Sequence, residues 1–337
     1  MISSPYLLYL GAATDPLAVK TARGVAEWRP RLCLGQRRLP GCEVTLGLED
    51  MTVGQAAAGG ARTMIIGEAN AGGVLSAAAI PEIVAALEAG LDVASGLHQR
   101  LGDVPAIREA AQRLGRRLFD VRQPPGDLAV GKGTPRAGLR LLTVGTDCSM
   151  GKMYTSLALE REMRARGVKA DFRATGQTGI AITGWGIAVD HVIADYVNGA
   201  AESLIDQGAE HGDLLFLEGQ GSLLHPGYSA VTQGLLHGSQ PDVLVLQHLA
   251  GQTHNDDYPS RPIPPLRDVI ALYELSASAV RPAAVAAIAL NTKHLDDAGA
   301  RQAIATAEAE TGLVADDVVR YGPDRLLDAV LAAVDAL

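Results

Sequence analysis

Cysteine is scarce in this sequence. The only three, Cys33, Cys42 and Cys148, have the spacing of neither a metal site nor a disulfide framework. Such scarcity is typical of a reducing compartment. The opening stretch, MISSPYLLYL, has no basic segment and no long apolar segment, so no secretory signal is predicted. No apolar run reaches the about 18 residues that a membrane-spanning helix needs. We therefore expect a cytoplasmic protein that does not enter a membrane.

Positive charge is also limited. The net charge is −9, and the 29 Lys and Arg residues nowhere form a long run. Because nucleic-acid binding requires clustered cations that neutralise phosphates, we expect small-molecule partners and no nucleic acid. The composition, with 47% hydrophobic and 20% charged residues, is that of a globular protein. A length of 337 residues suggests two domains.

The first predicted domain covers residues 1–122, where apolar strand-like runs alternate with helical patterns that end in glycine. This alternation predicts parallel strands joined by helices, as in a Rossmann-like α/β sheet. The expected helices include 81–90 and 104–115. The expected strands are residues 5–11, 43–47, 63–68, 91–96 and 117–122.

A linker is predicted over residues 123–138, which contain three Pro and four Gly and no periodicity. It separates the first domain from a second α/β domain, residues 139–337. A helix is expected there over 190–207, and another closes the chain. The strands expected in the second domain begin near residues 139, 168, 213, 241, 284 and 317, and the last of them spans 317–322.

The most informative stretch is LRLLTVGTDCSMGKMYTSLALEREMRARG, residues 139–167. It reads as a strand, a glycine-bounded loop and a helix, which is the layout of a phosphate-binding loop and predicts a P-loop NTPase-like domain. Gly151 would let backbone N–H groups face the anion, and Lys152 would reach its outer oxygens. The residues expected to bind the anionic cofactor are Gly145, Thr146, Asp147, Cys148, Ser149, Met150, Gly151, Lys152, Met153 and Tyr154.

Two positions depart from the pattern G-x-x-x-x-G-K-[ST]. Thr146 replaces the first glycine, and Met153 replaces the hydroxyl residue that would bind the magnesium of a nucleotide. A thioether is a poor ligand for a hard cation. The loop therefore suits phosphate better than magnesium-dependent phosphoryl transfer, and no metal site is expected. Cys148 is interpreted as a loop residue rather than a nucleophile, because no histidine is near it in sequence.

Further candidates follow the expected strands. Glu218 ends the run DLLFLE, as an acidic residue does beside many phosphate loops. The sequence GQGS after it could present N–H groups. His248 ends another strand and precedes a long irregular loop, which is interpreted as a substrate lid rather than a metal site. A glycine-rich stretch from Gly176 to Gly186 suggests backbone that approaches a ligand closely or moves over it.

Several of these motifs occur together in a known family. GTDCSMGKM, TGQTG, GIAVDHVIADYVNGAAE, LEGQGSLLHP, NAGGVL and GLDVASGLH resemble a bacterial family long catalogued as a domain of unknown function, some members of which are D-glutamate N-acetyltransferases. The loop is also similar to that of dethiobiotin synthetase, which has Thr where this chain has Met153. The resemblance implies an acyltransferase that moves acetyl from acetyl-CoA to a small acidic amino acid, with D-glutamate favoured. It also implies a homo-oligomer.

Acetyl transfer to an amine requires a base, donors for the thioester oxyanion and cations for the carboxylates of the acceptor. The candidate catalytic residues are Glu218, Asp190, Asp195 and Lys152. The candidate substrate-binding residues are Lys20, Arg173, Gln177, Thr178, Gly219, Gln220 and His248. Lys152 would hold phosphates of acetyl-CoA, and the N–H groups from Gly219 onward would meet the oxyanion.

Two other functions remain open. An ATP-dependent ligase or kinase acting on a small carboxylate, like dethiobiotin synthetase, would bind Mg-ATP in the loop, and Met153 counts against it. A sensor that binds a nucleotide or CoA without turnover is the third possibility, and the several acidic residues near the loop count against that.

Overall fold

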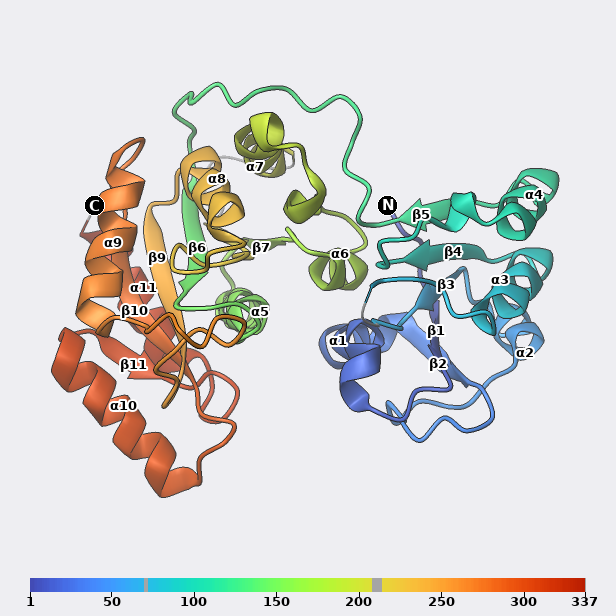
Figure 1. Ribbon diagram of the computed structural model, residues 1–337, viewed down its shortest axis with the longest axis horizontal. Helices are drawn as coiled ribbons and strands as arrows, with labels where there is room; N and C mark the ends of the chain where they lie inside the picture. The colour runs from blue at the N-terminus through green and yellow to red at the C-terminus, as the bar shows by residue number, and fades with distance from the viewer. Residues whose placement is uncertain (70–71, 208–213, 337) are drawn as a thin grey trace. The chain divides into compact units, whose positions relative to one another are not determined.

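The computed structural model describes residues 1–69, 72–207 and 214–336, which form two compact α/β units (Figure 1). The first unit comprises residues 1–124 and 176–191, and the second comprises residues 125–175 and 192–337. The chain therefore passes between the units three times. Among the described helices, none combines the length and apolar character needed to cross a bilayer.

The first unit is built on a parallel five-stranded sheet with the order β2-β1-β3-β4-β5. Its strands are β1 (Tyr6–Gly11), β2 (Cys33–Arg38), β3 (Thr63–Ile66), β4 (Asp92–Ser95) and β5 (Leu118–Asp120). Its helices are α1 (Lys20–Trp28), α2 (Val53–Ala58), α3 (Ala79–Glu88), α4 (Pro105–Leu114) and α6 (Gln177–Thr183). Right-handed crossovers place α2, α3 and α4 on one face, and α1 on the other, where it packs beside α6. Helices thus cover both faces, and Leu7, Leu8 and Tyr9 of β1 are fully buried.

One predicted strand of this unit is wrong. Residues 43–47 form no strand, and the edge of the sheet is β2, whose sequence CLGQRR lacks an apolar pattern. Buried Gln36 of β2 explains the difference. Its side chain donates to Thr45 Oγ1 at 3.0 Å and accepts from the Leu46 N–H at 2.8 Å. The Gln36 side chain thus holds residues 45 and 46 in place with hydrogen bonds that, in a strand, the backbone of a neighbouring strand would provide.

The second unit has a parallel six-stranded sheet with the order β11-β10-β9-β6-β8-β7. Its strands are β6 (Leu139–Gly145), β7 (Ala170–Arg173), β8 (Leu214–Leu217), β9 (Val243–Leu249), β10 (Ala284–Asn291) and β11 (Val314–Asp316). Its helices are α5 (Lys152–Ala165), α7 (Val197–Asp206), α8 (Ser229–Ser239), α9 (Leu266–Ser278), α10 (Asp297–Thr311) and α11 (Asp324–Asp335). Helices α5 and α11 pack together on one face, and α8 and α9 on the other. The expected α/β architecture, a Rossmann-like sheet followed by a P-loop-type sheet, is confirmed.

Two expected elements of the second domain are wrong. The helix predicted from residue 190 begins only at Val197, after two 3-10 turns, η4 (Val189–His191) and η5 (Ala194–Tyr196). The chain passes from one unit to the other between these two turns. The strand predicted over 317–322 is a turn, because the Asp317 carboxylate accepts the N–H groups of Val319 and Arg320.

The proline- and glycine-rich stretch after residue 123 has no regular secondary structure, but part of it is held against α7. The N–H groups of Lys132 and Gly133 donate to the Glu202 carboxylate at 2.9 and 2.7 Å, and Arg136 pairs with Asp206. This part of the chain is therefore fixed on the second unit.

Both sheets have a point where the strand order reverses. In the first unit it lies between β1 and β3, and in the second at β6, which lies between β8 and β9. Ligands of open parallel sheets bind at the carboxyl ends of the strands at such points. The predicted phosphate loop follows β6 and therefore occupies that position in the second unit.

Candidate functional site: a phosphate loop and its supports

The loop between β6 and α5 has the backbone geometry of an anion cradle. Gly151 has a φ of 119° and Ser149 a φ of 53°, so the chain turns sharply before Lys152 begins α5. Among the described residues, the N–H groups of Ser149, Met150 and Gly151 donate to no other group. Free N–H groups at the start of a helix attract an anion such as phosphate.

Lys152 lies buried inside the loop. Its Nζ donates to the Asp147 carbonyl at 2.7 Å, and burial lowers its pKa to about 8. Glycines make room for this side chain. A Cβ on Gly219 would lie 3.1 Å from Lys152 Cδ and only 1.7 Å from the Thr143 carbonyl oxygen. An anion bound in the loop would offer the ammonium group a stronger partner than a carbonyl.

The Asp147 carboxylate fixes the loop to a distant segment. It accepts hydrogen bonds from the Cys148 N–H at 2.7 Å, Gln252 Nε2 at 2.7 Å, Asn255 Nδ2 at 2.6 Å and the Asp256 N–H at 2.8 Å. These four donors satisfy the hydrogen-bonding capacity of one buried carboxylate. The irregular stretch after β9, predicted as a lid, is thereby tied to the phosphate loop at these residues.

Tyr273 of α9 holds the beginning of the loop in place through hydrogen bonds to its backbone. Its buried hydroxyl donates to the Gly145 carbonyl at 2.7 Å and accepts from the N–H groups of Gly145 and Leu223 at 3.4 and 3.1 Å. Beside it, Thr146 Oγ1 lies 2.9 Å from His248 Nδ1. Burial lowers the pKa of His248 to about 4, so this histidine is neutral at physiological pH.

Glu218 follows β8 and is buried at the same edge. Its Oε2 accepts the Thr175 N–H at 2.9 Å, and its carbonyl accepts the Thr175 hydroxyl at 2.7 Å. Gln220 Nε2 donates to Thr175 Oγ1 at 3.2 Å. Buried Arg173, at the end of β7, pairs with Asp171 at 2.8 Å. The second unit thus brings Glu218, Gly219, Gln220, Arg173 and His248 to the strand ends that carry the phosphate loop.

Other predicted site residues lie elsewhere. Lys20, Gln177, Thr178 and Asp190 belong to the first unit, whereas Asp195 belongs to the second and is exposed in η5. Asp190 pairs with Arg122. Gln177 and Thr178 pack in α6 against glycines of the first unit. Asp190 and Asp195 therefore do not lie on one helix, contrary to the sequence prediction.

The loop offers no hydroxyl next to its lysine. Met153 occupies that position, and the Thr155 hydroxyl donates to Gln247 Oε1 at 2.6 Å and is buried. The side chains around Lys152 therefore suit an anion and do not reproduce the ligand set of a nucleotide-bound magnesium ion.

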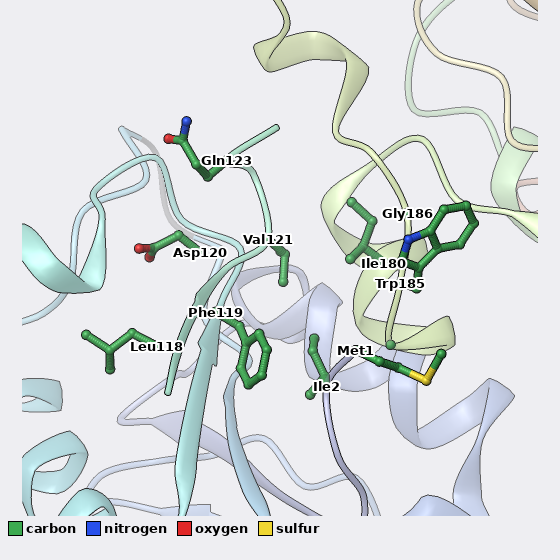
Figure 2. Close-up of a pocket in the computed structure, with 11 residues that line it drawn as sticks. Met1, Ile2, Leu118, Phe119, Asp120, Val121, Gln123, Ile180, Trp185 and Gly186 are labelled. Carbon is green, nitrogen blue, oxygen red and sulfur yellow. The ribbon is translucent and has the colours of Figure 1, made fainter. Parts of the chain in front are cut away.

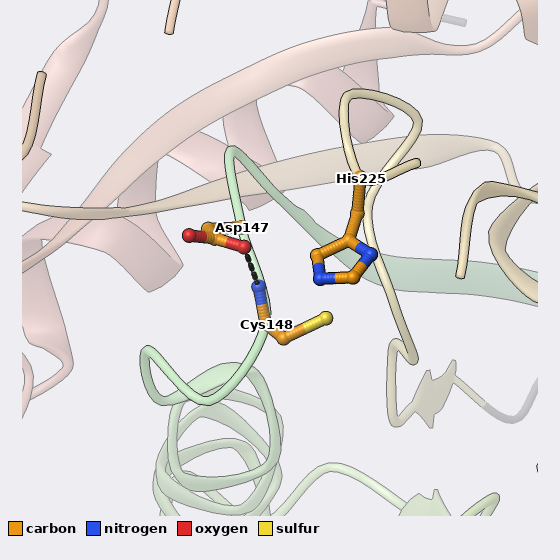
Figure 3. A group of neighbouring side chains, drawn as sticks. All are labelled: Asp147, Cys148 and His225. Carbon is orange, nitrogen blue, oxygen red and sulfur yellow. Dashed lines mark hydrogen bonds between the residues drawn. The ribbon is translucent and has the colours of Figure 1, made fainter. Parts of the chain in front are cut away.

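Asp147, Cys148 and His225 offer ligand atoms that all lie within 4.8 Å of one another (Figure 3). The hydrogen bonds do not fit a metal. Both Asp147 oxygens already accept N–H donors, as the preceding geometry shows. His225 Nδ1 accepts the N–H groups of Gly227 and Tyr228 at 3.1 and 3.2 Å, so the ring proton resides on Nε2, which faces Asp257 at 3.2 Å. Burial also raises the pKa of Cys148 to about 11, which keeps it a thiol.

The first unit contains a pocket of about 350 Å³ beside edge strand β5 (Figure 2). Its lining residues are Met1, Ile2, Leu118, Phe119, Asp120, Val121, Gln123, Ile180, Gly184, Trp185 and Gly186. Figure 2 shows Phe119 and Val121 on the side of β5 nearer Ile2 and Ile180, whereas Asp120, the one acidic residue of the lining, points to the other side of the strand. The side chains of β5 that face Ile2 and Ile180 are therefore apolar, and Asp120 is the one carboxylate in the lining.

Sequence reasoning missed most of the residues that hold the loop in place. Tyr273 sits in an ordinary apolar helix pattern, and no local signal distinguishes it. Asn255 and Asp256 lie in the irregular loop after β9, where no pattern distinguishes them, and Asp256 contributes its backbone N–H rather than its carboxylate. His225 could have been noticed in the motif LEGQGSLLHP, but its partners become visible only in the structure.

Comparison with known proteins gives consistent results over nearly the whole chain. Two relatives are named D-glutamate N-acetyltransferase. The one from Tritonibacter scottomollicae is 48% identical and covers 98% of this chain and 100% of its own length. The one from a Pseudoalteromonas species is 43% identical, with coverages of 97% and 98%. A crystal structure of a DUF1611 family protein from Anabaena variabilis ATCC 29413 superposes with a TM-score of 0.84 at 39% identity, covering 98% of this chain and 99% of that one.

Two domain families of unknown function match the chain in sequence. Residues 37–124 match the Rossmann-like domain DUF1611_N, and residues 128–327 match the P-loop domain DUF1611_C. The resemblance inferred from the motifs is confirmed, and the chain belongs to the DUF1611 family.

Proposed function

We propose that this protein is an N-acetyltransferase that moves the acetyl group of acetyl-CoA to the amine of D-glutamate. The observation that carries the proposal is the phosphate loop. It has free N–H groups and a buried lysine but no hydroxyl ligand for magnesium, a combination that suits the phosphates of a carrier such as CoA. The two relatives that share 43% and 48% of their residues with this chain carry the corresponding name.

In this proposal the phosphate loop binds the phosphates of CoA, and the thioester bond that reacts lies elsewhere. About a dozen single bonds separate the pyrophosphate of CoA from its sulfur, so an extended arm places the thioester on the order of 15 Å from the phosphates. Lys152 and the N–H groups from Ser149 to Gly151 would bind the phosphates. The neutral His248 and buried Tyr273 would keep the strand end and loop in the binding geometry.

The chemistry needs a free amine. The acceptor ammonium gives a proton to a base, the amine nitrogen attacks the thioester carbonyl, a C–N bond forms, the C–S bond breaks and the CoA thiol leaves with a proton. Glu218, Asp190 and Asp195 remain the proposed bases. Arg173 and Lys20 remain proposed partners of the acceptor carboxylates. Replacing each acid by its amide tests these roles, and an unchanged turnover removes that residue.

The decisive experiment measures thiol release. Purified protein is incubated with acetyl-CoA and a panel of D- and L-amino acids in the presence of EDTA. We expect thiol release with D-glutamate and little with the other acceptors. Lys152→Met should lower kcat/KM for acetyl-CoA about 100-fold or more, because a charged hydrogen bond to phosphate is lost. Lys293→Met, which changes an exposed lysine of the same unit, should behave like the unchanged protein. ATP-dependent turnover without thiol release would instead favour the ligase.

We also propose a homo-oligomer, which the sequence resemblance implies, and a cytoplasmic location, which the scarcity of cysteine favours. Light scattering of the purified chain tests the assembly directly, and a monomer at micromolar concentration would contradict it.

A further inference from the structure

A buried side-chain amide of the second unit lies against the phosphate loop and takes no part in the proposed chemistry. Gln247 is 2% exposed and lies near the end of β9, the strand next to β6. In the sheet it is paired with Gly145, the last residue of β6, and its carbonyl accepts the Thr146 N–H at 3.1 Å. Gln247 is therefore fixed at the point where the phosphate loop begins.

The amide group of Gln247 packs against Gly151, at the other end of the loop. A Cβ on Gly151 would lie 3.5 Å from Gln247 Nε2, 3.6 Å from Cδ and 3.8 Å from Oε1, which are ordinary contact distances. With no Cβ in between, the amide borders the backbone of Gly151, whose N–H is one of those that the loop leaves free. Gln247 thus places a polar side chain at the edge of the predicted anion site.

Only one end of this amide has a partner. The hydroxyl of buried Thr155 in α5 donates to Gln247 Oε1 at 2.6 Å. Among the described residues, Gln247 Nε2 donates to none. Nor is this atom one of the unpartnered polar atoms that the protein covers completely, so a ligand in the loop can reach it. An amide N–H2 group inside a protein is costly unless an acceptor completes it.

The contact with Thr155 fixes which way the amide points. If the amide were reversed, Nε2 would face the Thr155 oxygen, and the Thr155 hydroxyl proton would have no acceptor among the described residues. Oε1 would then border the loop, where it would repel an anion. The observed arrangement satisfies Thr155 and leaves an N–H2 group next to the loop.

An anion in this loop needs more donors than the loop motif supplies. A pyrophosphate such as that of CoA carries negative charge on both phosphates. Lys152 supplies one positive charge, burial lowers its pKa to about 8, and Met153 offers no hydroxyl for a magnesium ion. A neutral N–H2 group adds a hydrogen bond to a charged oxygen without the cost of burying a further cation.

We propose that Gln247 Nε2 donates a hydrogen bond to a phosphate oxygen of the anion in the loop, an inference that rests on the proposed binding of acetyl-CoA phosphates there. Gln247 is then a binding residue that lies about 100 positions from the loop motif. Thr155 is a positioning residue, which holds the amide by its Oε1. The second unit alone supplies every group of this site.

Nuclear magnetic resonance of the full chain tests the contact directly, with inorganic pyrophosphate and EDTA. The side-chain amide signal of Gln247, assigned through the backbone of residues 246–248, should shift in a saturable way as pyrophosphate is added. The signal of Gln302, an exposed glutamine of α10, should stay in place. This measurement needs no variant, so it holds even if a substitution at the buried position prevents folding.

Calorimetry with pyrophosphate and with CoA measures the contribution to affinity. Gln247→Met keeps the size of the side chain and removes the donor, and it should weaken binding of both ligands about 10-fold. Thr155→Val removes the hydroxyl that holds the amide and should weaken binding about threefold or less. The double variant should match Gln247→Met alone. Gln302→Met is the matched control, because Gln302 also lies beside a threonine, Thr306, at 3.4 Å, and it should change nothing.

The outcomes separate this inference from the proposed function. An amide signal that does not move at saturating pyrophosphate overturns the inference, and so does equal affinity in the parent and Gln247→Met. Equal losses in Gln247→Met and Thr155→Val would mean that Gln247 acts only by holding α5. If the parent binds neither pyrophosphate nor CoA, both proposals fail. Thiol release with D-glutamate that is unaffected by Gln247→Met leaves the acetyl transfer standing alone. Pyrophosphate binding through Gln247 without thiol release leaves only the anion site.

Discussion

Two buried tyrosine hydroxyls, one at the carboxyl edge of each sheet, are in opposite states. Tyr273 in the second unit makes three hydrogen bonds, two with Gly145 and one with Leu223. Tyr9 in the first unit makes none with any described residue. The two residues have the same chemistry and similar burial, so the difference lies in what their surroundings provide.

The contrast extends to the acids beside them. Asp147 receives four N–H donors, whereas Glu68 lies near one serine hydroxyl at 3.4 Å. The edge of the second sheet is therefore preorganised by its own hydrogen bonds and leaves N–H groups free for an anion. At the edge of the first sheet the free groups are oxygens. The comparison teaches that the edge of the second sheet leaves hydrogen-bond donors free for a ligand, whereas the edge of the first sheet leaves oxygen atoms.

The largest expected effect comes from crowding the preorganised edge. Gly219→Ala places a Cβ 1.7 Å from the Thr143 carbonyl oxygen, and the backbone must move to relieve this contact. We expect a loss of about 3 kcal/mol or more in unfolding free energy, together with loss of acetyl-CoA binding. Gly54→Ala, at a helical position with open space around it, should instead stabilise by about 0.5 kcal/mol. Scanning calorimetry compares the two, and a tolerated Gly219→Ala would show that the edge is not rigid.

The two tyrosines give the next effect and compare the edges directly. Tyr273→Phe removes a hydroxyl that satisfies buried backbone groups of Gly145 and Leu223, and should cost about 1–3 kcal/mol of unfolding free energy. Tyr9→Phe removes an unpartnered hydroxyl and should change the ligand-free stability by less than about 0.5 kcal/mol, or raise it. Denaturant melts of both variants measure this. Equal losses would mean that the two edges do not differ.

The smallest expected effect is a pH dependence of donor binding. Burial lowers the pKa of Lys152 to about 8, so the free protein loses this positive charge as pH rises through that value. Phosphate binding requires the charged form, so acetyl-CoA affinity should be highest below the pKa and fall about tenfold between pH 7 and pH 9. Calorimetric titration at both values checks the slope. In Lys152→Met, binding should be weak at both pH values and show no such fall.

Most elements could be predicted from sequence because their signals are local. The strand, loop and helix around Gly151 and Lys152 appear in one continuous stretch, and α3 and α4 lie where glycine-terminated helical patterns predict them. Strand β2 could not be found this way. It is an edge strand with Gln36 and two arginines, and its buried amide is satisfied by residues 45–50 rather than by an apolar pattern.

The supports of the site could not be predicted, because they depend on contacts between distant residues. Asn255 meets Asp147 across 108 positions, and Tyr273 meets Gly145 across 128. The hydrophobic periodicity of the sequence does not predict which distant residues form such contacts. The position of Glu68 at the point where the strand order reverses could be recognised only from the strand order of the sheet. Its sequence context, GEANAGG, predicts only a turn after a strand.

The return of residues 176–191 to the first unit has a consequence for synthesis. Helix α6, which packs beside α1, belongs to the first unit but is translated after β6, α5 and β7 of the second. The first unit therefore cannot complete its fold on the ribosome before residue 191 has emerged. By then β6, α5 and β7 of the second unit have also been synthesised, so the folding of the two units overlaps in time. A gene cut at residue 124 would produce an amino-terminal fragment whose α1 lacks its neighbouring helix, so the two halves are unsuited to separate expression.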